Sequence, residues 1–190
     1  FAVISVARSG LREPHPFTVS GMGTDGSVEF SIRPSGDFTR RLRERLSEGD
    51  TLMLEGGYGT FRPQDHASDQ LWVAGGIGIT PFLAAAEALP DDWSGQIVLV
   101  HSVRNAEDAV GANRLRAVAA RLDGFTYHLH DSATSGRLTG ARIIALLPFQ
   151  LRKAEMWFCG PAALRTALEK QFRAEDQTPR RIHFERFEFR

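Results

Sequence analysis

Cysteine is nearly absent from this chain of 190 residues, and Cys159 is the only one. A single thiol excludes an internal disulfide framework, because a disulfide needs two cysteines. It also excludes an iron–sulfur cluster or a four-cysteine zinc site ligated by this chain alone. We therefore expect no metal-binding residues in the chain.

An excess of either charge is lacking too, since 23 basic residues balance 23 acidic ones. Such a balance provides no field that would attract nucleic acid or an anionic membrane. No run reaches the roughly 20 apolar residues of a membrane span, and no signal-peptide pattern opens the sequence. We expect a soluble segment with no nucleic-acid partner and no membrane span. It lacks an initial methionine, which favours an origin in a longer protein.

Two different patterns of hydrophobicity divide the sequence into two parts. Residues 1–67 contain short alternating runs such as FAVISV, FTVSG, VEFSIRP and TLMLEG, with one short helical stretch, FTRRLRERL. This spacing predicts a small antiparallel β-barrel. Residues 68–190 alternate apolar strands with helical patterns, from LWVAGG and PFLAAAEAL to EMWFCG and AALRTALEKQF. That order predicts an α/β domain with a parallel sheet and helices on both faces.

The strongest local signal lies at residues 71–81, LWVAGGIGITP, where an apolar run breaks into three glycines before a helical pattern. A strand that turns through glycines into a helix presents backbone N–H groups to a phosphate. Pro81 suits the first helical turn, and Thr80 is expected to cap it. The spacing is not GxGxxG, so an ordinary strand-to-helix turn explains this stretch equally well when it is taken alone.

Six motifs occur in the order found in the ferredoxin–NADP reductase superfamily: HPFT (15–18), GDFT (36–39), GGYG (56–59), the glycine loop, CGP (159–161) and an aromatic C-terminus. The chain resembles the FAD- and NAD(P)-binding module of that superfamily. The HPFT form is similar to the dehydrogenase domain of the ferric reductase and NADPH oxidase branch. Two departures stand out: Gly57 replaces the usual proline, and the barrel lacks the strands that normally precede the position of Phe1, so it is expected to be incomplete.

The resemblance implies an FAD site in the first domain. Phe17 takes the place that stacks on the flavin, Thr18 lies on the flavin N5 side, and His15 lies near the pyrophosphate. Without the resemblance, residues 15–18 would be an edge strand with Phe17 in the core, and Thr39 a helix cap. We accept a solvated face only for Arg40, Arg41, Arg43 and Arg45. The expected FAD-binding residues are His15, Pro16, Phe17, Thr18, Ser20, Arg33, Gly36, Phe38 and Thr39.

The resemblance also implies a nicotinamide dinucleotide site in the second domain. Arg104 takes the position that meets the adenosine ribose or its 2′-phosphate, which favours NADPH while NADH stays open. Arg114 is interpreted as a solvated helical arginine. Cys159 lies beside the nicotinamide, although a buried cysteine is more often a small core residue. The expected residues are Gly75, Gly76, Gly78, Ile79, Thr80, Pro81, Ser102, Arg104, Cys159, Gly160 and Pro161.

The alternating C-terminus, HFERFEFR, predicts a strand whose last aromatic residue covers the flavin in the family. Phe187 and Phe189 are both candidates, whereas Phe184 is expected in the core. Together with Thr18 and Cys159, Phe187 and Phe189 complete the expected catalytic set.

The implied function is that of an enzyme, an NAD(P)H-dependent flavoprotein oxidoreductase. NAD(P)H passes a hydride to FAD, which then releases single electrons to an acceptor outside this chain. By branch resemblance that acceptor is a haem in an upstream membrane domain of the same parent protein, leading to oxygen or ferric iron, with this segment at the cytoplasmic face of the membrane. The alternatives are a soluble flavin or ferredoxin-type reductase, and a non-catalytic nucleotide-sensing module.

Overall fold

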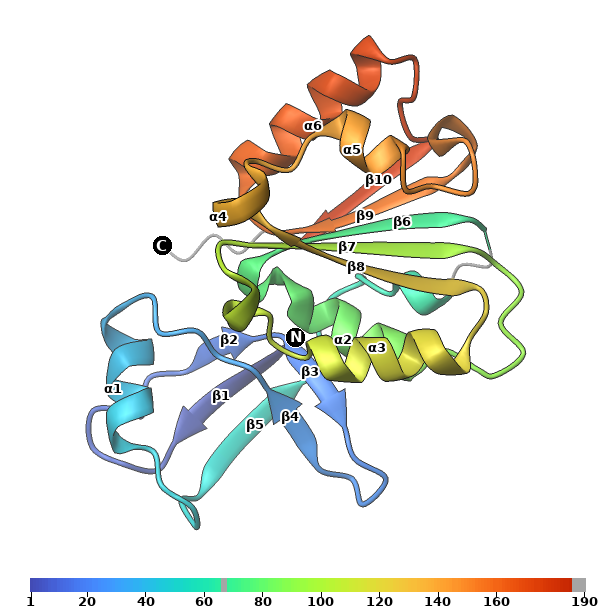
Figure 1. Cartoon of the computed structure of the whole chain (residues 1–190). Coiled ribbons are helices and arrows are strands. Elements are labelled where there is room, and N and C mark those ends of the chain that lie inside the picture. The colour runs from blue at the N-terminus through green and yellow to red at the C-terminus, as the bar shows by residue number, and fades with distance from the viewer. Residues whose placement is uncertain (66–67, 186–190) are drawn as a thin grey trace. The chain divides into compact units, whose positions relative to one another are not determined.

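The computed structural model describes residues 1–65 and 68–185, and the chain divides into two compact units, Phe1–Thr60 and Phe61–Arg190. Each unit has its own sheets and its own buried side chains (Figure 1). Phe61 belongs to the second unit, where its ring packs edge-on against Trp157 at a centroid distance of 5.0 Å.

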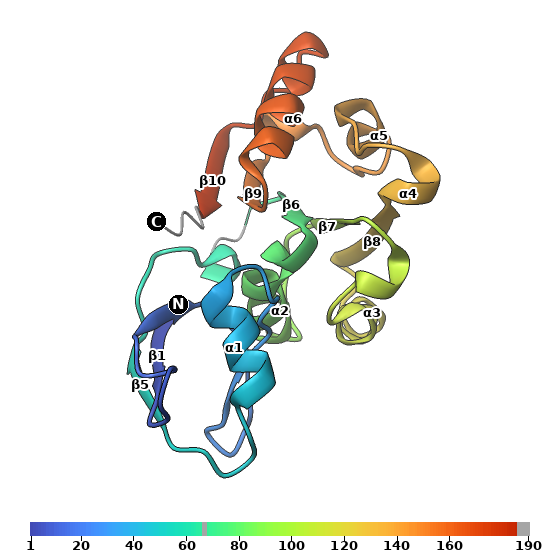
Figure 2. The same cartoon turned by 90° about the vertical axis from the view of Figure 1, so that its left-hand side faces the viewer.

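The first unit is built from antiparallel strands and one helix. The strands β2, β1 and β5 form one sheet in that order, and β3 pairs with β4 in a second (Figure 1). Figure 2 shows β1 beside β5. Its small core contains Val6, Leu11, Phe38 and Leu42. The described strands thus form two antiparallel sheets. The elements are β1 (Ala2–Val6), β2 (His15–Phe17), β3 (Val19–Met22), β4 (Val28–Phe30), α1 (Asp37–Arg45) and β5 (Leu52–Gly56).

The second unit has a parallel sheet of five strands in the order β10-β9-β6-β7-β8. The helices α2 and α3 cover one face, and α5 and α6 cover the other (Figure 1). The strands are β6 (Gln70–Gly75), β7 (Ile97–Val103), β8 (Phe125–Asp131), β9 (Glu155–Cys159) and β10 (Arg181–Glu185). The helices are α2 (Thr80–Glu87), α3 (Ala112–Arg121), α4 (Ser132–Ser135), α5 (Gly140–Ile144) and α6 (Ala162–Ala174). The short 3₁₀ turns are η1 (Pro63–Asp65), η2 (Gly76–Ile79), η3 (Ala106–Asp108) and η4 (Leu151–Lys153).

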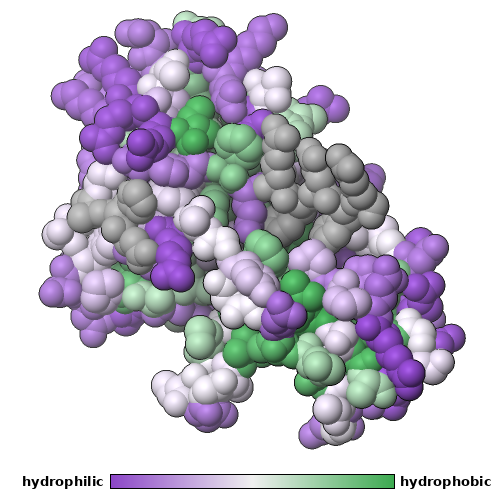
Figure 3. All heavy atoms as spheres, turned by 180° about the vertical axis from the view of Figure 1, so that it is seen from behind, coloured by the Kyte–Doolittle hydropathy of each residue, from purple (hydrophilic) through white to green (hydrophobic). Residues whose placement is uncertain are grey.

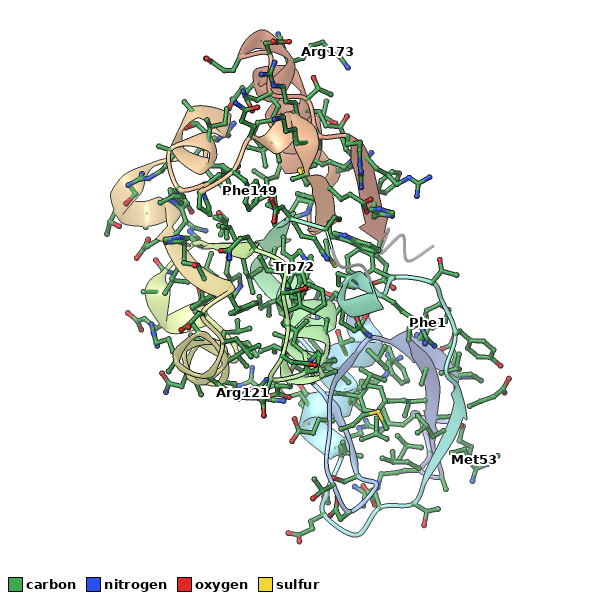
Figure 4. The ribbon with its side chains drawn as sticks, turned by 90° about the vertical axis from the view of Figure 1, so that its right-hand side faces the viewer. Phe1, Met53, Trp72, Arg121, Phe149 and Arg173 are labelled. Carbon is green, nitrogen blue, oxygen red and sulfur yellow. The ribbon has the colours of Figure 1, made fainter. Side chains whose placement is uncertain are left out.

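The apolar runs of the central strands supply both faces of this sheet. Trp72 and Ala74 of β6 pack toward α2 and α3, while Leu71 and Val73 pack toward α5 and α6. Successive strand residues point to opposite faces, so a strand buried on both sides reads as a continuous apolar run. Trp72 accordingly lies inside the unit in Figure 4, whereas Met53 on β5 of the first unit is 71% exposed and points outward. The two-domain fold class is confirmed.

Candidate nucleotide and flavin site

The glycine loop lies at the carboxyl edge of the parallel sheet, between β6 and α2 (Figure 1). Parallel strands collect ligands at this edge, because the chain leaves every strand there and the following helix begins with unpaired N–H groups. The carboxyl ends of β7 and β9, on either side of β6, bring Ser102 and Cys159 to the same edge. The predicted residues 75–81, 102–104 and 159–161 are therefore gathered along one edge of one sheet.

Three of the predicted glycines allow two loop backbones to touch. A Cβ on Gly78 would lie 2.3 Å from the carbonyl oxygen of Cys159, and a Cβ on Gly75 would lie 2.6 Å from Pro161 Cδ. From the opposite loop, a Cβ on Gly160 would lie 2.9 Å from the Gly75 backbone. No side chain fits at these distances. The glycines thus hold the loop after β6 against the loop after β9.

The residues that follow these glycines face inward. Ile79 is fully buried, and Thr80 and Pro81 are buried in the first turn of α2. The expectation that Thr80 caps the helix is wrong, because Ile79 already has helical backbone angles and the Thr80 hydroxyl instead donates to the carbonyl of Ile77 at 3.2 Å. Pro81 lies in the first turn as expected. The side chains of this segment therefore fix the loop from the inside.

His101 on β7 is a residue of this site that the sequence analysis missed. Its fully buried imidazole bonds the carbonyl oxygen of Gly76 through Nε2 at 2.9 Å, and Nδ1 lies 3.2 Å from the Tyr127 hydroxyl. Burial lowers the pKa of His101, although the bond to Gly76 opposes that shift. A polar residue inside the apolar run IVLVHSV was the available signal, because a buried imidazole needs partners.

Arg104 follows β7, and its backbone is held by the neighbouring segment. The Ala133 N–H donates to the Arg104 carbonyl at 2.9 Å, and Asp131 accepts from the Ala106 N–H at 3.1 Å. The guanidinium of Arg104 is exposed and makes no ion pair within residues 1–65 and 68–185. Arg114, by contrast, forms two hydrogen bonds of 2.6 Å with Glu87. The backbone of Arg104 is thus held in place, and its guanidinium is available to an anion.

Cys159 is fully buried at the end of β9 and belongs to the core that packs against α2. Burial, followed by the carboxylate of Glu185, raises the pKa of its thiol. The thiol is therefore protonated at neutral pH and is a poor nucleophile. Its backbone carbonyl meets the glycine loop.

In the first unit, the rings of the HPFT motif on β2 pack against Phe38 of α1. The rings of His15 and Phe38 stack at a centroid distance of 3.6 Å, and Phe17 lies 6.4 Å from Phe38. Phe17 is half-buried against the small core. The hydroxyl oxygen of Thr18 is buried and makes no hydrogen bond with the described residues. An unpaired buried hydroxyl is costly, so it marks a place where a ligand would supply the partner.

The start of α1 combines an internal cap with open space. The Thr39 hydroxyl accepts from the N–H groups of Ser35 at 2.9 Å and Gly36 at 3.0 Å, so Thr39 is the N3 residue of a capping box, a structural role that the flavin interpretation of Thr39 did not include. A Cβ on Gly36 would meet nothing within 4 Å. Arg33 is exposed nearby in the sequence, whereas Ser20 is fully buried and its hydroxyl accepts from Ser31.

The end of β10 corrects one expectation. Phe184 is 43% exposed, and the Arg165 guanidinium lies 3.7 Å from its ring centroid, so the core interpretation of Phe184 is wrong. As an edge strand, β10 pairs only with β9 among the described strands. Phe187 and Phe189 lie outside the described residues.

The geometry defines a class of protein: an α/β nucleotide-binding unit joined to an antiparallel unit of the flavin-binding type. The family model for the oxidoreductase NAD-binding domain matches residues 72–170, and the chain belongs to this family. Within it, the chain is a member of the ferredoxin–NADP reductase superfamily, as the sequence resemblance predicted.

Two relatives illustrate the similarity in sequence. The toluate 1,2-dioxygenase electron transfer component of Pseudomonas putida is 27% identical over 185 residues, covering 94% of this chain and 55% of the relative. The ferredoxin reductase component of 3-ketosteroid-9-alpha-monooxygenase from Mycolicibacterium smegmatis is 35% identical over 168 residues, covering 86% and 47%. The chain spans about half the length of these curated relatives.

Solved structures agree on the fold. The FAD/NAD-binding domain of nitric oxide dioxygenase from Vibrio cholerae superimposes with a TM-score of 0.78 at 19% identity, covering 97% of this chain and 81% of that one. The ferredoxin reductase of carbazole 1,9a-dioxygenase gives 0.71 at 24%, covering 99% and 59%. Within residues 1–65 and 68–185, no helix has both the length and the hydropathy needed to cross a membrane.

The close approach of the two loops makes a first prediction. Gly78→Ala places a methyl group against the Cys159 carbonyl, so one loop must move, and we expect a loss of at least about 2 kcal/mol in the free energy of unfolding of the second unit. Chemical denaturation measures this loss. Ala84→Gly in α2 is the control for composition and should cost only about 1 kcal/mol. Equal stability of Gly78→Ala and the unmodified protein would contradict the packing role.

Burial of histidine makes a second prediction. The pKa values of His101 and His128 are lowered in the folded chain, so the unfolded chain binds more protons below the ordinary histidine pKa. The free energy of unfolding should therefore be at its full value above about pH 6.5 and fall as the pH drops below it. Thermal unfolding between pH 8 and pH 5 measures this dependence. In His101→Phe the slope should be smaller, and an unchanged slope would rule out His101 as a contributor.

Proposed function

We propose that this chain is the FAD- and NAD(P)H-binding part of a reductase that passes electrons from NAD(P)H through FAD to a protein acceptor. The observation that carries the proposal is the glycine loop held at the carboxyl edge of the parallel sheet, where β6, β7 and β9 end together. This arrangement offers backbone N–H groups and a helix start to a dinucleotide diphosphate. Arg104 and Ser102 border the same edge and are proposed to meet the adenosine ribose.

The described residues fit an FAD site in the first unit. The unpaired Thr18 hydroxyl is available to a polar edge of the flavin, and Phe17 offers a half-buried aromatic ring beside it. At α1, the open space at Gly36 admits a diphosphate close to the helix start. Arg33 adds a positive charge, and Pro16 limits the conformation of the strand next to Phe17. Ser20 is the weakest member of the proposed site, because its hydroxyl already accepts from Ser31.

Positioning is the main contribution of the chain. FAD, when bound, accepts two electrons from NAD(P)H and can release them one at a time. The loops at Gly78 and Gly160 fix where the nicotinamide half lies, and Cys159 keeps a neutral thiol beside it. Since donor and acceptor atoms must meet at about 3–3.5 Å, small errors in placement reduce the rate strongly. Phe187 and Phe189 remain candidates for an aromatic cover of the flavin.

The acceptor proposed here differs from the one implied by the branch resemblance. The toluate dioxygenase and ketosteroid monooxygenase relatives are electron transfer and ferredoxin reductase components of oxygenase systems. Such relatives favour the ferredoxin-type reductase over an oxidase or ferric reductase attached to a membrane haem domain. We therefore propose an iron–sulfur domain or protein, or an oxygenase component, as the acceptor.

Replacing Thr18 should stabilise the protein without FAD and weaken its binding of FAD. Thr18→Val removes a buried unpaired hydroxyl at nearly constant volume, so the protein without FAD should gain about 1 kcal/mol in its free energy of unfolding. The same change should weaken FAD binding about tenfold, because one hydrogen bond is lost. Denaturation without FAD and flavin-fluorescence titration measure the two effects. Thr24→Val in the exposed turn between β3 and β4 is the matched control, and both quantities should stay unchanged.

If the unmodified chain binds no FAD and NADPH does not bleach added FAD near 450 nm, the proposed function is wrong.

Arg104 gives a prediction about the choice of dinucleotide. Arg104→Ala should weaken NADP⁺ binding about 10- to 100-fold and NAD⁺ binding much less, because a guanidinium grips a 2′-phosphate through charge-assisted hydrogen bonds. Calorimetric titration with both nucleotides measures the difference. Arg121→Ala is the control, because Arg121, the last residue of α3, already pairs with Asp91 and with the Leu89 carbonyl. Equal losses for both nucleotides, or none, would remove Arg104 from the 2′-phosphate site.

A further inference from the structure

The peptide bond between Gly76 and Ile77 is held in one orientation by His101. Gly76 has a positive φ of 55°, and its carbonyl oxygen lies 2.9 Å from His101 Nε2. A trans peptide is planar, and its N–H points opposite to its C=O. With the carbonyl turned toward β7, the Ile77 N–H is directed away from that strand.

We propose that His101 is a positioning residue for the dinucleotide, which fixes the Gly76–Ile77 peptide so that the Ile77 N–H is presented to the diphosphate. This inference rests on the proposed function of the glycine loop. The added feature is the buried His101 side chain on β7, which sets the direction of the Ile77 N–H. His101 does not itself touch the ligand.

The hydrogen-bonding pattern assigns one tautomer to His101. A carbonyl oxygen only accepts, so Nε2 must carry the proton that is donated to Gly76. Nδ1 then accepts from the Tyr127 hydroxyl at 3.2 Å. Burial raises the pKa of Tyr127 to about 12 and lowers that of His101, so the neutral forms of both groups prevail near pH 7. Tyr127 on β8 thereby orients an imidazole on β7, which orients a peptide after β6.

A second buried histidine provides a matched control. His130 on β8 bonds the carbonyl of Gly136 through Nε2 at 2.9 Å, which is the same chemistry at a different loop. A merely structural role would make His101 and His130 equivalent in their effect on nucleotide binding. The proposal makes them different, because only His101 acts on the glycine loop.

The test compares His101→Phe with His130→Phe by calorimetric titration with two probes. ADP-ribose contains the diphosphate, and adenosine does not. We expect His101→Phe to weaken ADP-ribose binding about tenfold and to leave adenosine binding unchanged, while His130→Phe changes neither. His101→Gln, which retains an N–H donor, should recover part of the ADP-ribose affinity. In the free protein, the amide resonance of Ile77 should shift in His101→Phe and stay in place in His130→Phe.

The outcomes separate this inference from the function on which it rests. If the unmodified chain binds no ADP-ribose, the proposed function fails. If it binds and His101→Phe binds equally well, or loses adenosine to the same degree, the positioning role is overturned. Should His101→Phe not fold, Tyr127→Phe takes its place, because it removes only the hydroxyl that orients the imidazole. An unmoved Ile77 resonance and unchanged ADP-ribose affinity in that variant would also overturn the role.

Discussion

Two backbones meet without side chains between them at the carboxyl edge of the parallel sheet, and the remainder of the proposed nucleotide site is arranged around this contact. Gly78 lies so close to the Cys159 carbonyl that a Cβ would approach it to 2.3 Å, and Gly75 and Gly160 face each other in the same way. Because both loops follow adjacent strands, their spacing is set by the sheet itself. Because the glycine loop cannot move toward β9, its outer surface stays in a fixed position relative to the sheet.

The other side of the same loop is held by hydrogen bonds. His101 bonds the Gly76 carbonyl from β7, and the Thr80 hydroxyl bonds the Ile77 carbonyl from within α2. Two successive carbonyls are thus engaged inside the protein. Because the N–H of a trans peptide points opposite to its C=O, the Ile77 N–H is directed away from β7, and this is the side on which we propose that the diphosphate binds. Steric contact on one side and hydrogen bonding on the other therefore both hold the loop that forms the proposed diphosphate site.

The elements could be predicted where hydrophobic periodicity was strong. β6 and β7 are apolar runs buried on both faces, and α2 follows a helical pattern from Pro81, so their order alone indicated a parallel sheet. The errors have local causes. Thr80 was expected to cap a helix whose preceding residue is already helical, and Phe184 was placed in the core although it lies on an edge strand beneath Arg165. Neither a backbone angle nor a neighbour from another helix can be read from spacing. The role of His101 could not be predicted, because its hydrogen-bond partners Gly76 and Tyr127 are distant in the sequence.

The first unit has fewer internal contacts to rely on than the second. Its core cluster contains four buried apolar residues, and the apolar side chains of Leu52, Met53 and Leu54 on β5 are all at least 48% exposed. Apolar residues reach the surface on the face seen in Figure 3 as well. A ligand that binds only the folded form stabilises it by mass action, and the effect matters most where the core is small. FAD, bound as proposed at Thr18 and the start of α1, would connect the segment between β2 and β3 to α1 through a partner that neither segment supplies. On this proposal, occupation of the flavin site helps to order the first unit, whereas the second unit, with a core on each face of its sheet, is expected to fold without a nucleotide.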